Sequence, residues 1–113
     1  MTNINANIIS LVKLMIECHD NGDFSKLTTI MDKITLDAED TFFTREKFDE
    51  VSKKIHQQLG SHGKIEFMGQ LNKKNSIHTL WKVKYSNTTD DILWQATINL
   101  DEKNPKILRM SVN

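Results

Sequence analysis

Residues 55–67 read IHQQLGSHGKIEF, and the spacing of the apolar residues changes within this stretch. Before it, apolar residues recur every three or four positions, which is the spacing of one helical face. After it, apolar and polar residues alternate, which is the pattern of a strand with one buried face. Gly60 and Gly63 lie at the change, where a chain reversal favours glycine. The sequence therefore predicts an α+β fold, with helices in the first half and an antiparallel sheet in the second.

Two helices are predicted in the first third of the chain. The first spans Ile4 to Asp20, and its apolar arc is too broad to be covered from one side. Asn21-Gly22 ends this helix because both residues tolerate positive φ, and Asp23 is placed to cap a second helix. The buried face of the second helix is predicted to contain four residues: Leu27, Ile30, Met31 and Ile34.

A third helix has the clearest local signature. Thr44 is placed as its N-cap, and Phe43 and Phe48 occupy the two positions of a hydrophobic staple. Glu46 lies in the first turn, where a negative charge suits the helix dipole. Gly60 is placed to end this helix.

Four strands are predicted after Gly63, separated by polar turns at 72–76, 86–90 and 101–105. Turns this short favour an antiparallel meander. The alternation places these residues on the face that packs against the helices: Ile65, Phe67, Leu71, Trp81, Val83, Tyr85, Trp94, Ala96, Ile98, Leu100, Leu108, Met110 and Val112. The opposite face is predicted to be mainly polar, with four apolar exceptions: Met68, Leu80, Leu93 and Ile107.

Composition restricts the class of protein. The chain has 113 residues, of which 38% are hydrophobic and 27% charged, and this describes one globular domain over residues 1–113. Fifteen Lys and Arg balance fifteen Asp and Glu. Proteins that bind nucleic acid usually carry a basic excess, because phosphate neutralisation supplies much of their affinity. We therefore expect no nucleic-acid partner.

Cysteine use and apolar runs indicate a location. Cys18 is the only cysteine, so an intrachain disulfide, a thiolate zinc cluster and a paired redox motif are all excluded. The first residues lack the basic start and apolar core of a signal peptide, and every apolar run is too short to span a membrane. The sequence predicts a cytoplasmic protein without a membrane partner.

Three runs of residues carry a resemblance to a known superfamily: Asn21-Gly22-Asp23-Phe24, residues 43–60 and residues 98–112. On these runs the chain resembles a small family of unknown function in the nuclear transport factor 2-like, or cystatin-like, superfamily. The resemblance implies three N-terminal helices packed on a curved four-stranded antiparallel sheet, the cone of that superfamily. Its motifs are caps, turns and core positions, and the superfamily contains both enzymes and non-catalytic binding domains. It therefore implies a fold without implying an activity.

His19 is the main candidate for a catalytic residue. At 100° per residue it points into the apolar arc of the first predicted helix, between Ile8 and Val12. In a cone fold that direction leads to the pocket, where a histidine can act as a general base with Tyr85 as its partner. A histidine in the last turn of a helix more often caps backbone carbonyls or packs half-buried, and we favour that role.

Three aromatic residues are candidates for lining a ligand pocket beside His19. Trp81, Tyr85 and Trp94 are predicted to lie on the inward side of neighbouring strands, where they can enclose a hollow between sheet and helices. Aromatic residues at such positions more commonly fill a core. Both interpretations stay open at this point.

Three apolar residues on the opposite face are candidates for a dimer interface. If the strands pair as the turns suggest, Met68, Leu80 and Leu93 cluster there with Ile107 beside them. An exposed apolar patch of this kind marks a partner surface, and sheet-to-sheet homodimers are common in the superfamily that the chain resembles. A register shift of one residue would move every side chain to the other face.

The motifs favour a non-catalytic function. The sequence lacks a nucleophile–base pair, a phosphate-binding glycine loop and histidines at metal-ligand spacing, so we expect neither a metal nor a cofactor. We predict a binding or dimerisation module that takes a protein partner or a small apolar ligand in the cone. The alternative is a proton-transfer enzyme of the isomerase or hydratase type, with His19 as base and Tyr85 or Trp94 orienting the substrate.

Overall fold

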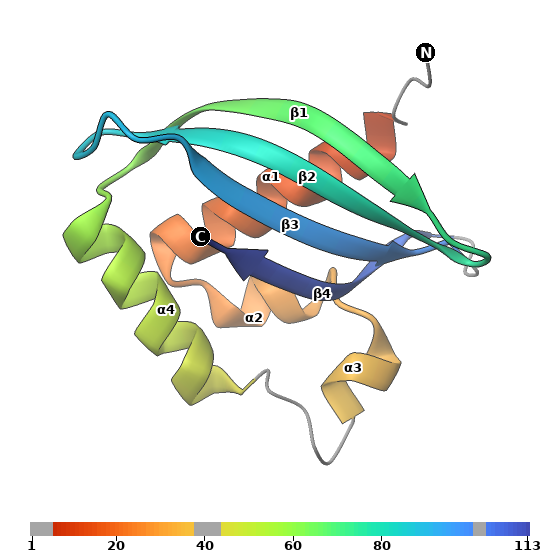
Figure 1. Ribbon diagram of the computed structural model, residues 1–113. Helices are drawn as coiled ribbons and strands as arrows, with labels where there is room; N and C mark the ends of the chain where they lie inside the picture. Colours follow the sequence, from red (N-terminus) through yellow and green to blue (C-terminus); the bar gives the residue numbers. More distant parts are fainter. Residues whose placement is uncertain (1–5, 38–43, 101–103) are drawn as a thin grey trace.

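The computed structural model describes residues 6–37, 44–100 and 104–113. Within these residues the chain forms α1 (Ala6–Asn21), α2 (Phe24–Thr28), α3 (Lys33–Asp37), α4 (Arg45–Gln58), β1 (His62–Asn72), β2 (Ser76–Tyr85), β3 (Ile92–Asn99) and β4 (Lys106–Val112). The strands form one antiparallel sheet in the order β1-β2-β3-β4. In Figure 1 these helices lie on one side of the sheet, and no described helix covers the other side. The predicted α+β fold is confirmed.

The local sequence determines where α4 begins. Thr44 Oγ1 accepts a hydrogen bond from the Lys47 N–H at 3.2 Å, as its N-cap position predicted. Phe48, one turn into the helix, is buried in the core. The predicted staple residue Phe43 lies outside the described residues, as do Ile4 and the side chain of Ile34.

Glycine determines where α4 ends. The N–H groups of Leu59 and Gly60 both donate to Ile55 O, at 2.8 and 3.0 Å. Gly60 has a φ of 86°, and a Cβ at this position would lie 2.9 Å from the side chain of Asn87. Both the backbone angle and the space therefore require glycine here.

The second predicted helix is divided, because its middle pairs with the sheet. Met31 forms a parallel bridge with Ile107 of β4. Ile107 N–H donates to Ile30 O at 2.9 Å, and Asp32 N–H donates to Ile107 O at 2.8 Å. These bonds to β4 replace helical bonds and separate α2 from α3. The prediction of three helices before the sheet was wrong in this segment.

A β-bulge in β1 changes which residues face the helices. Met68 is an extra residue in β1 with no partner on β2. Beyond it the alternation is inverted, so Leu71 lies opposite His78 on the face away from the helices and is 56% exposed. The prediction that Leu71 faces the core was wrong.

A second bulge has the opposite effect in β4. The pairing passes over Leu108, so Ile107 pairs with the inward residue Ile98 and is fully buried. Ile107 was predicted on the opposite face, and that prediction was wrong. Leu100, predicted to face inward, lies just beyond the end of β3 and is 44% exposed.

The core lies between the helices and the inward face of the sheet. Its largest fully buried side chains are Trp81 and Trp94 from the sheet and Phe48, Met15 and Ile16 from α4 and α1. Partly buried residues from α1, α2, α3, β1, β3 and β4, together with Leu59 just after α4, pack around this cluster. Helices and sheet thus share one continuous core.

Candidate functional site

His19 lies in the last turn of α1 and is only 4% exposed. Its Nδ1 donates a hydrogen bond to Met15 O at 2.9 Å, and its ring centre lies 4.9 Å from those of Phe48 and Trp94. Burial lowers the pKa of the imidazole below its ordinary value of 6.5, while the bond to Met15 and the charge of Asp20 act in the opposite sense. His19 is thus a buried side chain packed between aromatic rings.

The three candidate pocket aromatics are all buried and are bonded to protein partners. Trp94 Nε1 donates to Tyr85 Oη at 2.8 Å, and Trp81 Nε1 donates to Thr79 Oγ1 at 2.8 Å. Burial raises the pKa of Tyr85 to about 12, although the bond from Trp94 lowers it in part. Tyr85 therefore keeps its proton at neutral pH. The structure brings Trp94 together with both His19 and Tyr85, as members of the core.

An apolar patch lies on the sheet face that points away from the helices, which we call the outer face. Its members are Met68, Leu71, Leu80 and Leu93. Met68 at the bulge is 55% exposed, and Leu80 and Leu93 are partly exposed. The register of β2 and β3 makes Leu80 and Leu93 diagonal neighbours. Leu71 was missed as a member because its position depends on the bulge, and Ile107 leaves the predicted cluster because it is buried.

Ion pairs surround a small hollow of about 110 Å³ on the outer face, lined by Lys64, Glu66, Lys82 and Lys84. Lys82 Nζ lies 2.9 Å from Glu66 Oε2, and this bond lowers the pKa of Glu66 and raises that of Lys82. Lys84 pairs with Asp91, and its hydrogen bond lowers the pKa of that carboxyl. Lys82 and Lys84 of this hairpin are therefore partly neutralised by neighbouring carboxylates.

His78 belongs to a polar network on the same face. Its Nδ1 lies 2.8 Å from Thr97 Oγ1, and its Nε2 lies 2.9 Å from Gln95 Oε1. Both ring nitrogens therefore have a partner on β3. These two hydrogen bonds hold the imidazole against β3.

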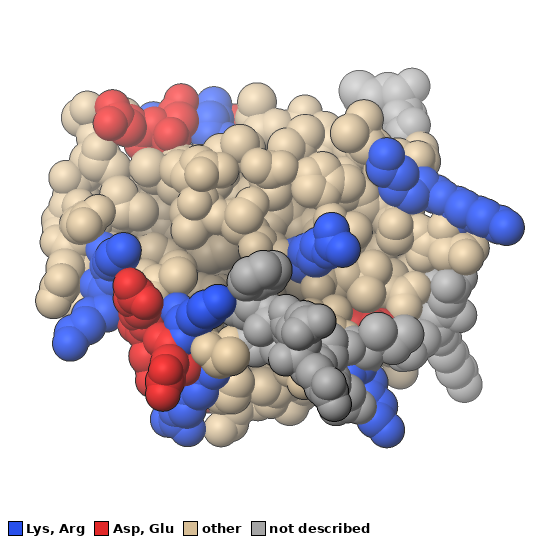
Figure 2. Space-filling model, turned by 60° about the horizontal axis from the view of Figure 1, so that its bottom comes forward, with Lys and Arg blue, Asp and Glu red and all other residues tan. Residues whose placement is uncertain are grey.

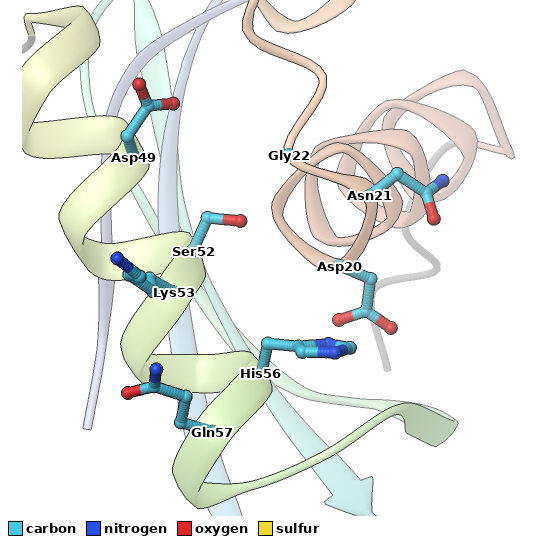
Figure 3. Close-up of a pocket in the computed structure, with 8 residues that line it drawn as sticks. All are labelled: Asp20, Asn21, Gly22, Asp49, Ser52, Lys53, His56 and Gln57. Atoms are coloured by element: carbon cyan, nitrogen blue, oxygen red, sulfur yellow. The ribbon is translucent and has the colours of Figure 1, made fainter.

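A second hollow, of about 620 Å³, lies between the C-terminal end of α1 and the side of α4 and is open to solvent. Figure 3 shows the residues that line it: Asp20, Asn21, Gly22, Asp49, Ser52, Lys53, His56 and Gln57. Asp20 Oδ2 accepts hydrogen bonds from the N–H of His62 at 3.0 Å and from its Nδ1 at 2.5 Å. Ser52 Oγ donates to His19 O.

Sequence reasoning did not find this second hollow. The residues that line it come from the end of α1 and from α4, with Gly22 between α1 and α2. His62, which binds Asp20, lies 42 positions further along the chain. A polar residue at the end of a helix is common, so the local pattern carries no signal for the pairing.

Charged side chains of both signs lie side by side over α4, at the lower left of Figure 2. Arg45 Nε lies 3.7 Å from Asp49 Oδ2, and Lys54 Nζ lies 3.7 Å from Glu50 Oε1. Such exposed pairs contribute little to stability. They give α4 a solvated surface of mixed charge.

Across residues 6–37, 44–100 and 104–113, no three His, Cys, Asp or Glu side chains are grouped so that they could hold a metal ion. In the same ranges, no helix combines the length and apolar composition required to span a bilayer.

Solved structures with a fold similar to that of this chain include the three described next. A designed protein with the nuclear transport factor 2-like fold matches with a TM-score of 0.62 and 15% identity, over 94% of this chain and 96% of the designed one. A SEC-C motif containing protein from Rhodopseudomonas palustris matches with a TM-score of 0.58 and 8% identity, over 89% and 74%. Bd1075 from Bdellovibrio bacteriovorus matches with a TM-score of 0.54 and 14% identity, over 95% of this chain and 40% of Bd1075.

Sequence comparison adds no relative, because no protein-family model and no curated protein sequence matches the chain. Structural likeness at these identities concerns the fold alone. It supports a nuclear transport factor 2-like α+β fold for this chain.

Proposed function

We propose that this chain is a non-catalytic interaction domain that pairs with a second copy of itself through the outer face of its sheet. One observation carries the proposal: Met68 and Leu71, more than half exposed, lie with Leu80 and Leu93 on a face that no described helix covers. Apolar side chains grouped on an exposed surface are typical of partner sites. Membership in the small family of unknown function that the sequence resembles stays a prediction.

The outer face has the size of a protein interface. Four strands at roughly 4.8 Å spacing and nine residues at roughly 3.3 Å rise give a face of about 19 Å by 30 Å. The side chains that project from it enlarge this flat area of about 570 Å². Stable interfaces bury about 800 Å² on each partner, so the face is of the size that a dimer requires.

The charges on this face suit a second copy as the partner. Two lysines of this face are paired with carboxylates, Lys82 with Glu66 and Lys84 with Asp91. In a two-fold symmetric pair each patch meets an identical patch, so lysines of one copy can oppose carboxylates of the other. The formal net charge of zero means that two copies do not repel each other overall.

The packing of the core supports a non-catalytic role over the two alternatives. A proton-transfer enzyme requires its base to reach a substrate, and His19 is enclosed by Phe48 and Trp94. A small apolar ligand in the cone would have to displace Trp81 or Trp94, each 1% exposed. No feature of the described residues specifically favours the proton-transfer enzyme or the ligand in the cone.

Analytical ultracentrifugation between about 10 µM and 1 mM tests the proposal. We expect the wild-type chain to form a reversible dimer, and Leu80→Glu to raise the dissociation constant at least about 100-fold because it places a charge in the apolar patch. The matched control is Val51→Glu on α4, where the same type of change at a 36% exposed residue should leave association unchanged. A wild-type chain that stays monomeric at 1 mM, or equal effects of the two variants, would overturn the proposal.

A further inference from the structure

Gly69 lies on the outer face, at a position of β1 where the folded chain does not need a glycine. Its register partner on β2 is Leu80, so a side chain at residue 69 would project from the outer face. The φ of Gly69 is not positive, unlike those of Gly22 and Gly60. A Cβ at residue 69 would have no described atom within 4 Å, its two chain neighbours aside. Neither the backbone angle nor the space therefore requires glycine here.

Glycine is an unfavourable residue inside a strand. It offers no side chain to pack, and it loses more backbone freedom on folding than other residues do. The adjacent bulge at Met68 does not account for Gly69, because the bulge type that favours glycine has it in a left-handed conformation. Glycine in a strand often marks a place where another molecule or backbone approaches closely. The choice of glycine is explained if another surface meets the outer face at this point.

The gap above Gly69 and the side chain of Leu80 complement each other. The two residues lie directly opposite on neighbouring strands, one without a side chain and the other with a partly exposed isobutyl group. A two-fold axis that lies parallel to the sheet and runs between β1 and β2 places β1 of each copy over β2 of the other. Leu80 of each copy then lies over Gly69 of the other copy.

The same axis also brings opposite charges together. Glu66 is the register partner of Lys82, and Lys82 Nζ lies 2.9 Å from Glu66 Oε2. The axis that superposes Leu80 and Gly69 places Glu66 of one copy over Lys82 of the other. The apolar contact and the charges of this face are therefore satisfied by one arrangement of two copies.

Given the dimer proposed above, on which this inference rests, we propose that Leu80 of each copy inserts into the gap above Gly69 of the other. Sheets that pack face to face lie about 10 Å apart, and their side chains interdigitate. A larger residue at position 69 would collide with the inserted leucine, and a smaller residue at position 80 would leave a void. The Leu80–Gly69 contact thus sets how the two sheets are aligned.

Analytical ultracentrifugation of Gly69→Val tests the contact. We expect its dissociation constant for dimerisation to be at least about tenfold higher than that of the wild-type chain. At about 1 µM, where the chains are mainly separate, the midpoint of its urea unfolding should be no lower than that of wild type. The matched control is Gly63→Val in the same strand, where a Cβ would lie 3.8 Å from Lys84 O. This control lies outside the apolar patch and should leave dimerisation unchanged.

Mixing two variants tests whether the contact is made between copies. Gly69→Val fills the gap, and Leu80→Ala removes the side chain that enters it. In a dimer of one chain of each variant, the valine meets the alanine, and the native leucine of the first chain meets the native glycine of the second. We expect this mixed dimer to bind at least about tenfold more tightly than either variant binds itself. Native mass spectrometry should therefore show more mixed dimer than random pairing gives.

The outcomes separate this contact from dimerisation itself. A wild-type chain that stays monomeric would overturn both the proposed function and the Leu80–Gly69 contact. A dimer that Leu80→Glu weakens but Gly69→Val does not, or mixed dimers in the random proportion, would overturn the contact alone. A Gly69→Val chain that fails to fold, or that unfolds at a lower urea concentration than wild type, would show that the single chain requires this glycine and would also overturn the inference.

Discussion

The buried environment of His19 predicts a specific dependence of stability on pH. Burial lowers the pKa of His19 in the folded chain, so the unfolded chain binds its proton more readily. The stabilising contribution of the neutral ring is complete above the ordinary pKa of 6.5 and is lost as the pH falls below it. The slope can reach about 1.4 kcal/mol per pH unit until the folded-state pKa is passed.

Replacement of His19 by residues that do not titrate isolates this contribution. His19→Leu keeps a comparable volume between Phe48 and Trp94, and His19→Gln keeps a donor near Met15 O. At pH 8 we expect each variant to be destabilised by about 1–3 kcal/mol, or less for leucine, since only one hydrogen bond and some packing are lost. Below pH 6.5 the difference in stability between wild type and each variant should shrink, because only the wild-type chain has a histidine at this position whose protonation is unfavourable in the folded state.

Urea unfolding followed by tryptophan fluorescence, at half-unit steps from pH 8 to pH 5, measures the effect. The free energy of unfolding of wild type minus that of each variant should fall steadily below pH 6.5 for both substitutions. A difference that stays constant over this range would show that His19 gains its proton as easily in the folded chain as in the unfolded one. The imidazole would then be accessible, and the core packing described above would be refuted.

Three further predictions concern the core and the ends of helices. Tyr85→Phe should lower the free energy of unfolding by about 1–3 kcal/mol, measured in urea, because it leaves the buried Trp94 Nε1–H without its acceptor; an unchanged stability would mean that Trp94 has another partner. Gly60→Ala should lower the free energy of unfolding by more than about 1 kcal/mol, and clearly more than Gly22→Ala does. The reason is that a Cβ at residue 60 meets Ser86 and Asn87, whereas one at residue 22 lies 3.8 Å from Ser52 Oγ. Equal losses of stability in thermal unfolding would contradict this difference. Thr44→Ala should lower the free energy of unfolding by about 1 kcal/mol, because the N-cap bond to Lys47 is lost. Thr88→Ala, in a turn, is the control. If the melting temperature of Thr44→Ala did not differ from that of the control, the stabilising role of the cap would be refuted.

Features that depend on neighbouring residues were predictable from the sequence. The change of period near Gly60, the Thr44 cap and the glycine at the end of α4 all follow from local patterns, and the structure contains each of them. The order and antiparallel pairing of the strands follow from the short turns between them. These local features are sufficient to predict the α+β fold from the sequence.

Features that depend on distant residues could not be predicted. The bulges at Met68 and Leu108 arise from pairing between strands. The first places Leu71, and the second Ile107, on the face opposite to the predicted one. The bridge between Met31 and Ile107 divides a helix that looks continuous in the sequence. A strict alternation cannot reveal these changes, because a single extra residue reverses it.

The candidate site also combines features that were predictable from local sequence with features that were not. Burial of Trp81 and Trp94 follows from their alternating positions, but the alternation does not tell a filled core from a lined pocket. The hydrogen bonds from His62 to Asp20 join the start of β1 to the end of α1, 42 positions apart in the chain. Such a juxtaposition leaves no trace in either segment alone.

Self-association through the outer face is tested most directly by NMR on a mixture of ¹³C-labelled and unlabelled chains. The measurement detects nuclear Overhauser effects between protons of different copies. We expect such contacts from the methyl groups of Met68, Leu71, Leu80 and Leu93. Contacts that arise from the helix side instead, or no intermolecular contact at millimolar concentration, would contradict the proposed function.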